Sequence, residues 1–121
     1  MKDPEVFIKH IIDSIEKVED FTYNKTRDDF LGNVQLQDAT IRRIEIIGEA
    51  SKNIPEDFKR QYPDVLWSEM ARTRDKLIHG YFGVDLELTW DIIEHDLPEL
   101  KEKMMHILEE IESPRIHTSD R

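Results

Sequence analysis

Apolar residues recur every three or four positions through most of this 121-residue chain, and this period limits its fold more than any other feature. Such spacing puts apolar side chains on one face of an α-helix, whereas a half-buried strand needs strict alternation. The first segment shows the period most clearly, at Ile8, Ile11, Ile12, Ile15 and Val18. Asp3 and Pro4 precede it as a helix cap and a first-turn proline. No segment alternates as a strand would, so the sequence predicts an all-α protein.

Caps and prolines mark the next helical segments. Thr26 and Asp29 have the spacing of a capping box, which predicts the start of a short second helix. A long helix is predicted over residues 38–53, where Pro55 prevents its continuation. Residues 55–63 are expected to form a short helical turn inside a loop.

Two more helices complete the predicted set. Asp64 is expected to cap a helix that carries Leu66 on its apolar face and stops at Gly80. Asp85 is a natural cap for a last long helix. Pro98 lies inside the apolar pattern of that helix and predicts either a kink or a junction between two helices.

The predicted architecture is an up-down bundle of four main helices with short extra helical turns. Residues 1–113 are expected to form the bundle. Residues 114–121 have little apolar content and are expected to form a flexible tail. Trp67 and Trp90 are predicted to anchor the core or an interface between two copies of the chain.

Composition excludes several classes of protein. The formal net charge is -10, whereas a general nucleic-acid binder presents a basic surface. The chain has no cysteine, which excludes disulfides and thiolate metal sites. No apolar run approaches the ~18 residues of a membrane span, and the N-terminus does not resemble a signal peptide. A cytoplasmic protein is therefore expected.

Charged and aromatic residues crowd the stretch RDKLIHGYF, residues 74–82, where a helix is predicted to end. Asp75 and His79 are one turn apart, so the carboxylate can fix the imidazole tautomer and leave the other ring nitrogen free for proton transfer. Arg74 and His79 lie about 140° apart around a helix, so one helix does not aim both at one phosphate. Three interpretations stay open: these residues form an ordinary helix cap, the following turn bends His79 back, or a second copy of the chain completes a phosphate-handling site.

The same stretch resembles a known motif. Arg74, His79 and Tyr81 match the pattern of the HEPN superfamily, which is Arg, four residues, His, any residue and Tyr. The downstream YFGVDLELTW and the upstream IRRIEIIGEASKNIP resemble the HepT-like branch of that superfamily. The resemblance covers roughly residues 4–112.

This resemblance implies a specific function. HepT-like proteins are toxins of two-gene, type VII-like toxin–antitoxin modules, and they form homodimers whose motifs meet in a cleft. Their activity is cleavage of RNA, tRNA included, without a metal ion or other cofactor. Carried over, Arg74 and His79 are the catalytic pair and Asp75 is their polar support. Tyr81 is the residue to which the partner antitoxin, a minimal nucleotidyltransferase, transfers AMP to silence the toxin.

An acidic ribonuclease needs a local basic surface, because its substrate is a polyanion. Arg42, Arg43, Arg72 and Lys76 are the residues expected to make the cleft a positive island that binds RNA. Asp75 departs from the family pattern, in which many relatives have Asn. Its negative charge beside an RNA phosphate would have to be neutralised by Arg74 or His79.

Two other functions compete with this interpretation. A non-catalytic helical module that docks a nucleotidyltransferase or a nucleotide would have the same fold, although such a module has no need of His79. A carboxylate-bridged metal bundle would need Glu-x-x-His on two helices. No histidine of the chain is preceded by Glu at that spacing, so no metal site is expected.

Overall fold

Every secondary-structure element in the computed structural model is a helix, within the residues it describes, 3–77 and 85–113. The elements are α1 (Pro4–Thr22), α2 (Arg27–Leu31), α3 (Val34–Asn53), α4 (Glu56–Arg60), α5 (Trp67–Leu77), α6 (Leu86–Asp91), the π-helical turn η2 (Ile92–Asp96) and α7 (Leu97–Glu112). None of these described helices is long and apolar enough to cross a bilayer. The expected tail, residues 114–121, lies outside the described residues.

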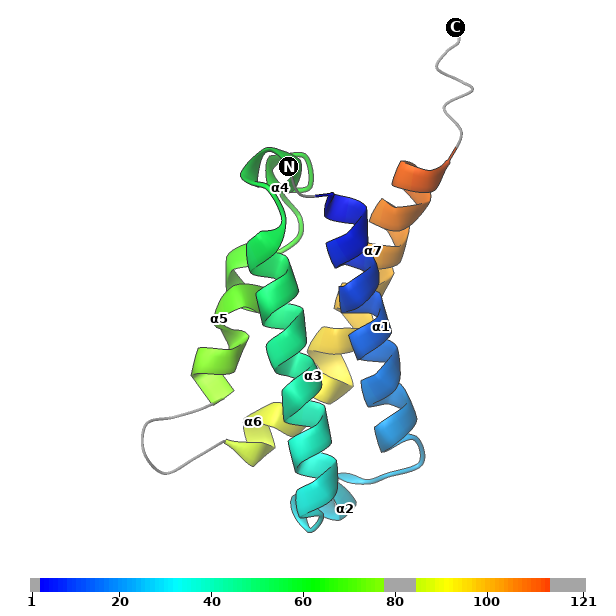
Figure 1. Ribbon diagram of the computed structural model, residues 1–121. Coiled ribbons are helices and arrows are strands. Elements are labelled where there is room, and N and C mark those ends of the chain that lie inside the picture. The colour runs from blue at the N-terminus through cyan, green and yellow to red at the C-terminus, as the bar shows by residue number, and fades with distance from the viewer. Residues whose placement is uncertain (1–2, 78–84, 114–121) are drawn as a thin grey trace, which may run out of the picture.

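The long helices form the predicted bundle (Figure 1). Helix α1 packs against both α3 and α7, and α5 packs against the other flank of α3. The fourth main segment is the continuous run of α6, η2 and α7. The all-α prediction with four main helices is therefore confirmed, with α2 and α4 as the short extra helices.

The first two helices begin as predicted, because their caps are local interactions. The Asp3 carboxylate accepts a hydrogen bond from the backbone N–H of Glu5 at 3.0 Å. At α2 the capping box is complete: the Thr26 hydroxyl accepts from the Asp29 N–H at 3.1 Å, and the Asp29 carboxylate accepts from the Thr26 N–H at 2.9 Å. These bonds satisfy N–H groups that a helix start leaves without partners.

Helix α3 begins four residues earlier than predicted, at Val34 rather than Asp38. Its cap is Asn33, whose side-chain oxygen accepts from the Leu36 N–H at 3.0 Å. The Gln37 side chain then donates to the Phe30 carbonyl of α2 at 3.0 Å, which ties the two helices together. The predicted end is confirmed, because the last residue of α3 is Asn53, directly before Ile54 and Pro55.

Helix α5 also begins elsewhere than predicted. Its first residue is Trp67, and Leu66 is 62% exposed instead of lying on the buried face. The Asp64 backbone carbonyl accepts a hydrogen bond from the ammonium of Lys103 at 2.7 Å, in the loop before the helix. The indole N–H of Trp67 donates to the Tyr62 carbonyl at 3.1 Å, which holds residues 62–66 as turns and delays the helix start.

Pro98 explains the break in the last segment. Asp85 caps α6 as predicted, accepting from the Leu88 N–H at 3.0 Å. Immediately before Pro98 the helix widens into the π turn η2, where the Leu97 N–H bonds to the Ile92 carbonyl. A proline cannot donate the next helical hydrogen bond, and the wider turn lets the chain continue as α7. Of the two predicted outcomes, a kink or a junction between two helices, the structure therefore contains the junction, at η2 between α6 and α7.

The core lies where α1, α3 and α7 meet. Side chains from all three helices are fully or almost fully buried there, including Ile11, Ile44 and Ile107. Both tryptophans belong to this core, and Trp90 packs against Phe30 with their ring centroids 5.5 Å apart. The prediction that the tryptophans act as core anchors is confirmed.

Candidate active site

Helix α5 carries the first half of the predicted motif, and it is held tightly against α3. Met70 is buried and belongs to the core. Gly48 of α3 faces it so closely that a Cβ atom at Gly48 would lie 3.3 Å from the Met70 carbonyl oxygen. The Trp67 indole fixes the start of the same helix through its bond to Tyr62. The backbone that leads to the motif is therefore positioned by the core.

The motif residues divide between two parts of the chain. The α5 backbone continues to Leu77, so Arg74, Asp75 and Lys76 fall in its last turns. Their side chains lie outside the described residues, as does the whole segment 78–84, which holds His79, Gly80 and Tyr81. The predicted catalytic pair, its polar support, the modification site and the helix end at Gly80 thus remain sequence predictions.

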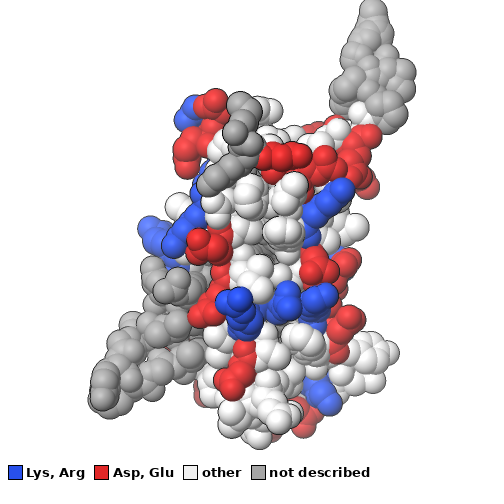
Figure 2. Space-filling view, in the orientation of Figure 1, with Lys and Arg blue, Asp and Glu red and all other residues white. Residues whose placement is uncertain are grey.

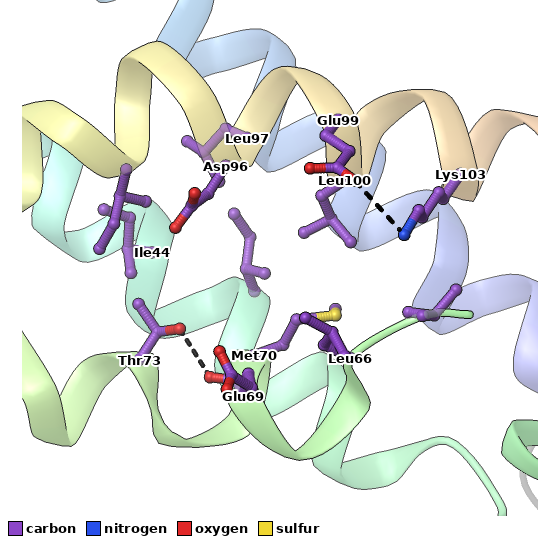
Figure 3. A pocket seen from close by; sticks show the side chains of 13 residues that line it. Ile44, Leu66, Glu69, Met70, Thr73, Asp96, Leu97, Glu99, Leu100 and Lys103 are labelled. Carbon is purple, nitrogen blue, oxygen red and sulfur yellow. Dashed lines mark hydrogen bonds and ion pairs between the residues drawn. The ribbon is translucent and has the colours of Figure 1, made fainter. Parts of the chain in front are cut away.

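A cavity beside α5, which we call the α5–α7 pocket, has a volume of about 160 Å³. Its apolar walls include Ile44, Ile47, Met70, Leu97 and Leu100. Figure 3 shows Glu69 of α5 on one wall, with Asp96 and Glu99 on the opposite wall. Lys103 pairs with Glu99 at 3.5 Å. Three carboxylates around an apolar cavity repel phosphate, so this pocket does not suit the backbone of RNA.

The predicted basic residues lie on two different helices. Arg42 of α3 lines a hollow between α1 and α3, its side chain is 70% exposed, and its guanidinium is 3.8 Å from Glu45. Figure 2 shows Lys and Arg side chains in a row across the middle of the face that α1 and α3 form. Arg43 is half-buried, and Arg72 is exposed on α5. No described contact joins Arg72 to the α3 arginines, and the side chain of Lys76 lies outside the described residues, so the positive island expected in the cleft stays a prediction.

A metal centre has no visible ligand set in this part of the protein. Within residues 3–77 and 85–113, no group of three or more His, Asp or Glu side chains is placed to hold a metal ion. His79 lies outside those ranges.

Sequence reasoning missed a second set of cations. Lys52, Lys59 and Arg60 line one groove with the start of α5, although they come from the ends of two helices. Their signal in the sequence was the stretch KNIPEDFKR, which has basic residues on both sides of a proline turn. That turn folds the two ends toward each other, which spacing alone does not reveal.

Comparison with known proteins identifies the family. The family described as ribonuclease HepT-like matches residues 11–107, a range that contains the whole motif from Arg74 to Tyr81. The chain belongs to the HepT-like ribonuclease family. The resemblance drawn from the motif and its flanks is thus confirmed.

Several HepT-like relatives support this assignment. A protein of Thermococcus cleftensis named probable ribonuclease HepT is 53% identical over 97 residues, which is 80% of this chain and 88% of that protein. A candidate RNase of Caldanaerobacter subterraneus is 38% identical over 109 residues, 90% of this chain and 97% of that protein. A protein of Methanocaldococcus jannaschii, named for gamma-glutamylcyclotransferase and a candidate RNase, is 51% identical over 111 residues. The chain spans 50% of that two-function relative. No solved structure gives a significant match.

Proposed function

We propose that this protein is the toxin of a toxin–antitoxin module and cleaves RNA, tRNA included, without a metal ion. The observation that carries the proposal is the intact Arg74, His79 and Tyr81 motif inside the range that the HepT-like family matches. Relatives of similar length carry ribonuclease names. Because tRNA is cytoplasmic, the toxin acts in the cytoplasm.

The chemistry of these side chains suits RNA cleavage. A 2′-hydroxyl must lose a proton to attack the neighbouring phosphate, and the leaving 5′-oxygen must gain one. His79 can exchange protons near neutral pH. Arg74 carries a permanent positive charge that stabilises the pentavalent phosphate. Asp75, one turn before His79, orients the imidazole through a hydrogen bond.

This function can be tested by induced expression in a bacterial host. Wild-type protein is expected to stop growth and to produce tRNA fragments in extracted RNA. His79→Ala, expressed to the same level, is expected to do neither. Growth arrest that persists with His79→Ala would show that toxicity does not come from this chemistry.

The active unit in this proposal is a homodimer with a composite site. The basis is the five-residue spacing of Arg74 and His79, which on a continuous helix would put them about 140° apart, so that one helix would not aim both at a single phosphate. Two chains related by a two-fold axis supply an Arg74 from one copy and a His79 from the other. Arg42, Arg43, Arg72 and Lys76 of both copies add positive charge around the cleft.

Subunit mixing tests the composite site. Arg74→Ala and His79→Ala homodimers are each expected to be inactive. After the two proteins are unfolded together and refolded, mixed dimers recover one intact pair and regain cleavage. If the mixture stays as inactive as its components while forming dimers, each chain builds its own site and the composite arrangement is wrong.

The proposed antitoxin is a minimal nucleotidyltransferase that transfers AMP from ATP to Tyr81: the phenolic oxygen loses its proton and bonds to the α-phosphorus, and pyrophosphate leaves. The added phosphate is negative and the added adenosine is bulky, so both repulsion and steric block would keep RNA out of the cleft. Incubation of wild type and Tyr81→Phe with the cognate enzyme and ATP radiolabelled at the α-phosphate tests this step. Label on wild type alone is expected, and equal labelling of both proteins would place the modification elsewhere.

A further inference from the structure

We infer that a basic groove at the start of α5 binds the phosphate backbone of the RNA on its way to the active site. The groove, called here the α4 groove, has a volume of about 560 Å³ and lies between the end of α3, α4 and the first turns of α5. The cations that line it are Lys52, Lys59 and Arg60. This inference rests on the proposed ribonuclease function and adds a part of the substrate path outside the motif.

The charge of the α4 groove contrasts with that of the whole molecule. Three cations and one carboxylate, Glu56, line it in a chain whose net charge is -10. The opposite holds for the α5–α7 pocket, which has three carboxylates and one lysine. Of these two hollows beside α5, the α4 groove is therefore the one that suits a polyanion.

Arg60 is the paired cation of the groove that can most easily exchange its partner for phosphate. It pairs with Asp57, and the two side chains are 70% and 90% exposed. An ion pair this exposed contributes at most about 1 kcal/mol, so an RNA phosphate can replace the Asp57 carboxylate. Lys59 lies 3.4 Å from Glu56 and is only 13% exposed, so it adds positive charge to the wall of the groove rather than a free ammonium. In the ranges 3–77 and 85–113, Lys52 makes no ion pair with another described residue.

The helix dipole gives a simpler reason for each cation taken singly. Lys52 is in the last turn of α3, and Lys59 and Arg60 are in the last turn of α4. Positive charge is favourable at the negative end of a helix. The dipole does not explain why two helix ends, joined through a proline turn, bring three cations into one groove. Binding of an anion does explain it.

The position of the groove connects it to the motif. Ser68 and Ala71 line it from α5, and that helix then continues to Arg74. Arg74 is six positions after Ser68, which is about 9 Å along a helix. Arg72 is exposed one turn beyond Ser68. Figure 2 shows Lys and Arg side chains along the edge where α4 and α5 lie, at the left of the view.

Contacts between the groove and the phosphate backbone of RNA predict its effect on affinity and specificity. Lys and Arg neutralise phosphates whatever the base sequence, and the binding releases counterions. The groove should thus raise the affinity for RNA without choosing the cleavage site. Losing it should raise KM and leave kcat nearly unchanged, because its residues do not touch the reacting atoms.

The test uses the double variant Lys52→Gln, Arg60→Gln. Binding is measured in a His79→Ala background, so that RNA is not consumed, by anisotropy of a short fluorescein-labelled single-stranded RNA over a salt series. The control is Lys17→Gln, Lys25→Gln, which makes the same change in net charge on exposed or half-exposed lysines outside the groove. Circular dichroism checks that all proteins keep the same helix content.

The groove variant is expected to bind more weakly, and the slope of log affinity against log salt should fall by about 1.4, or ~0.7 for each lost phosphate contact. The control should keep the parental slope, and in active protein only the groove variant should raise KM. If the groove variant bound RNA as tightly as the parent, or if both variants lost the same affinity, the groove would not be an RNA-binding site. Cleavage by wild type would in that case still support the ribonuclease function. Failure of the parent to bind RNA at all would overturn both.

Discussion

Gly48 and Met70 meet backbone to backbone where α3 packs against the motif helix α5. A Cβ atom on Gly48 would lie 3.3 Å from the Met70 carbonyl oxygen and 3.7 Å from that of Ala71. The Gly48 carbonyl in turn accepts a buried hydrogen bond from the hydroxyl of Ser51 at 2.8 Å. The contact involves backbone rather than flexible side chains, so the distance between the two helices depends on the absence of a side chain at residue 48.

Gly48→Ala should lower the free energy of unfolding by about 1 kcal/mol, although alanine is favoured over glycine by about 1 kcal/mol inside an open helix. The new methyl group must move α5 away from α3, which loosens the packing of Met70. Urea unfolding measures the change, and the larger side chain of Gly48→Val should cost more.

Gly32→Ala is the matched control for this prediction. A Cβ atom at Gly32 meets only the Asp28 carbonyl oxygen, at an ordinary 3.5 Å, and its φ of -100° suits any residue. Alanine there should be neutral or stabilising by up to about 1 kcal/mol. A gain in stability at Gly48 equal to that at Gly32 would show that α3 and α5 are not in backbone contact.

Asp29→Asn should make the protein less stable at pH 7 and change its response to acid. The backbone N–H of Thr26, with its side chain, holds the pKa of the Asp29 carboxyl below its usual value. A lowered pKa means that the stabilisation is present above the unfolded value of about 3.9 and is lost as the pH falls through the folded value. The difference between wild type and variant in urea unfolding should therefore shrink below about pH 4.

Asp28→Asn is the control, because it removes the same charge from the same turn without breaking the capping box. If both variants lost stability equally at every pH, general charge rather than the capping bond would account for the effect.

Lys101→Met should lower stability by removing the ion pairs that join α7 to α1. The Lys101 ammonium lies 2.9 Å from Glu19 and 3.5 Å from Glu16, and these are contacts between helices. The hydrogen bond to Glu19 is the main reason why the pKa of Lys101 is raised. A raised pKa gives stabilisation that is complete below the unfolded value of about 10.4 and is lost as the pH rises through the folded value. Methionine keeps the apolar stem, so the expected loss at pH 7 is about 0.5–1 kcal/mol.

The difference between wild type and Lys101→Met should begin to shrink above about pH 10.4 and disappear only once the pH has passed the raised folded pKa of Lys101. Lys17→Met provides the comparison. Among the described residues Lys17 pairs only with Asp13 of its own helix, at 3.4 Å, so this variant should lose no more than about 0.5 kcal/mol. If the two variants lost the same free energy of unfolding, the ion pairs between α1 and α7 would stabilise the protein no more than an ion pair within one helix.

Helix starts were predictable where one residue and its near neighbours make the cap. Asp3, Thr26 and Asp85 all act as the sequence predicted. The start of α3 was placed too late although its cap is also local, because the Asn33 side chain accepts from the Leu36 N–H. The start of α5 was misplaced where spacing gives no signal, in a segment held by the bond of the Trp67 indole to the Tyr62 carbonyl.

The family was predictable from the sequence, whereas the residues of the candidate site stay a prediction. The spacing of Arg74, His79 and Tyr81 indicated the family together with the flanking stretches IRRIEIIGEASKNIP and YFGVDLELTW, since the short motif alone is a weak signal. The groove formed by Lys52, Lys59 and Arg60 could not be predicted, since it arises only when the proline turn folds two helix ends together. How far two chains share the motif is a property of their association, which one sequence does not specify.

The central claim is metal-independent cleavage that requires His79. Purified wild type and His79→Ala, matched for helix content, are each incubated with total tRNA in EDTA and separated on a denaturing gel. Fragments from wild type alone are the predicted result. Equal cleavage by both proteins would contradict the role of His79, and intact tRNA in both lanes would contradict the nuclease itself and favour a helical module that docks a nucleotidyltransferase or a nucleotide.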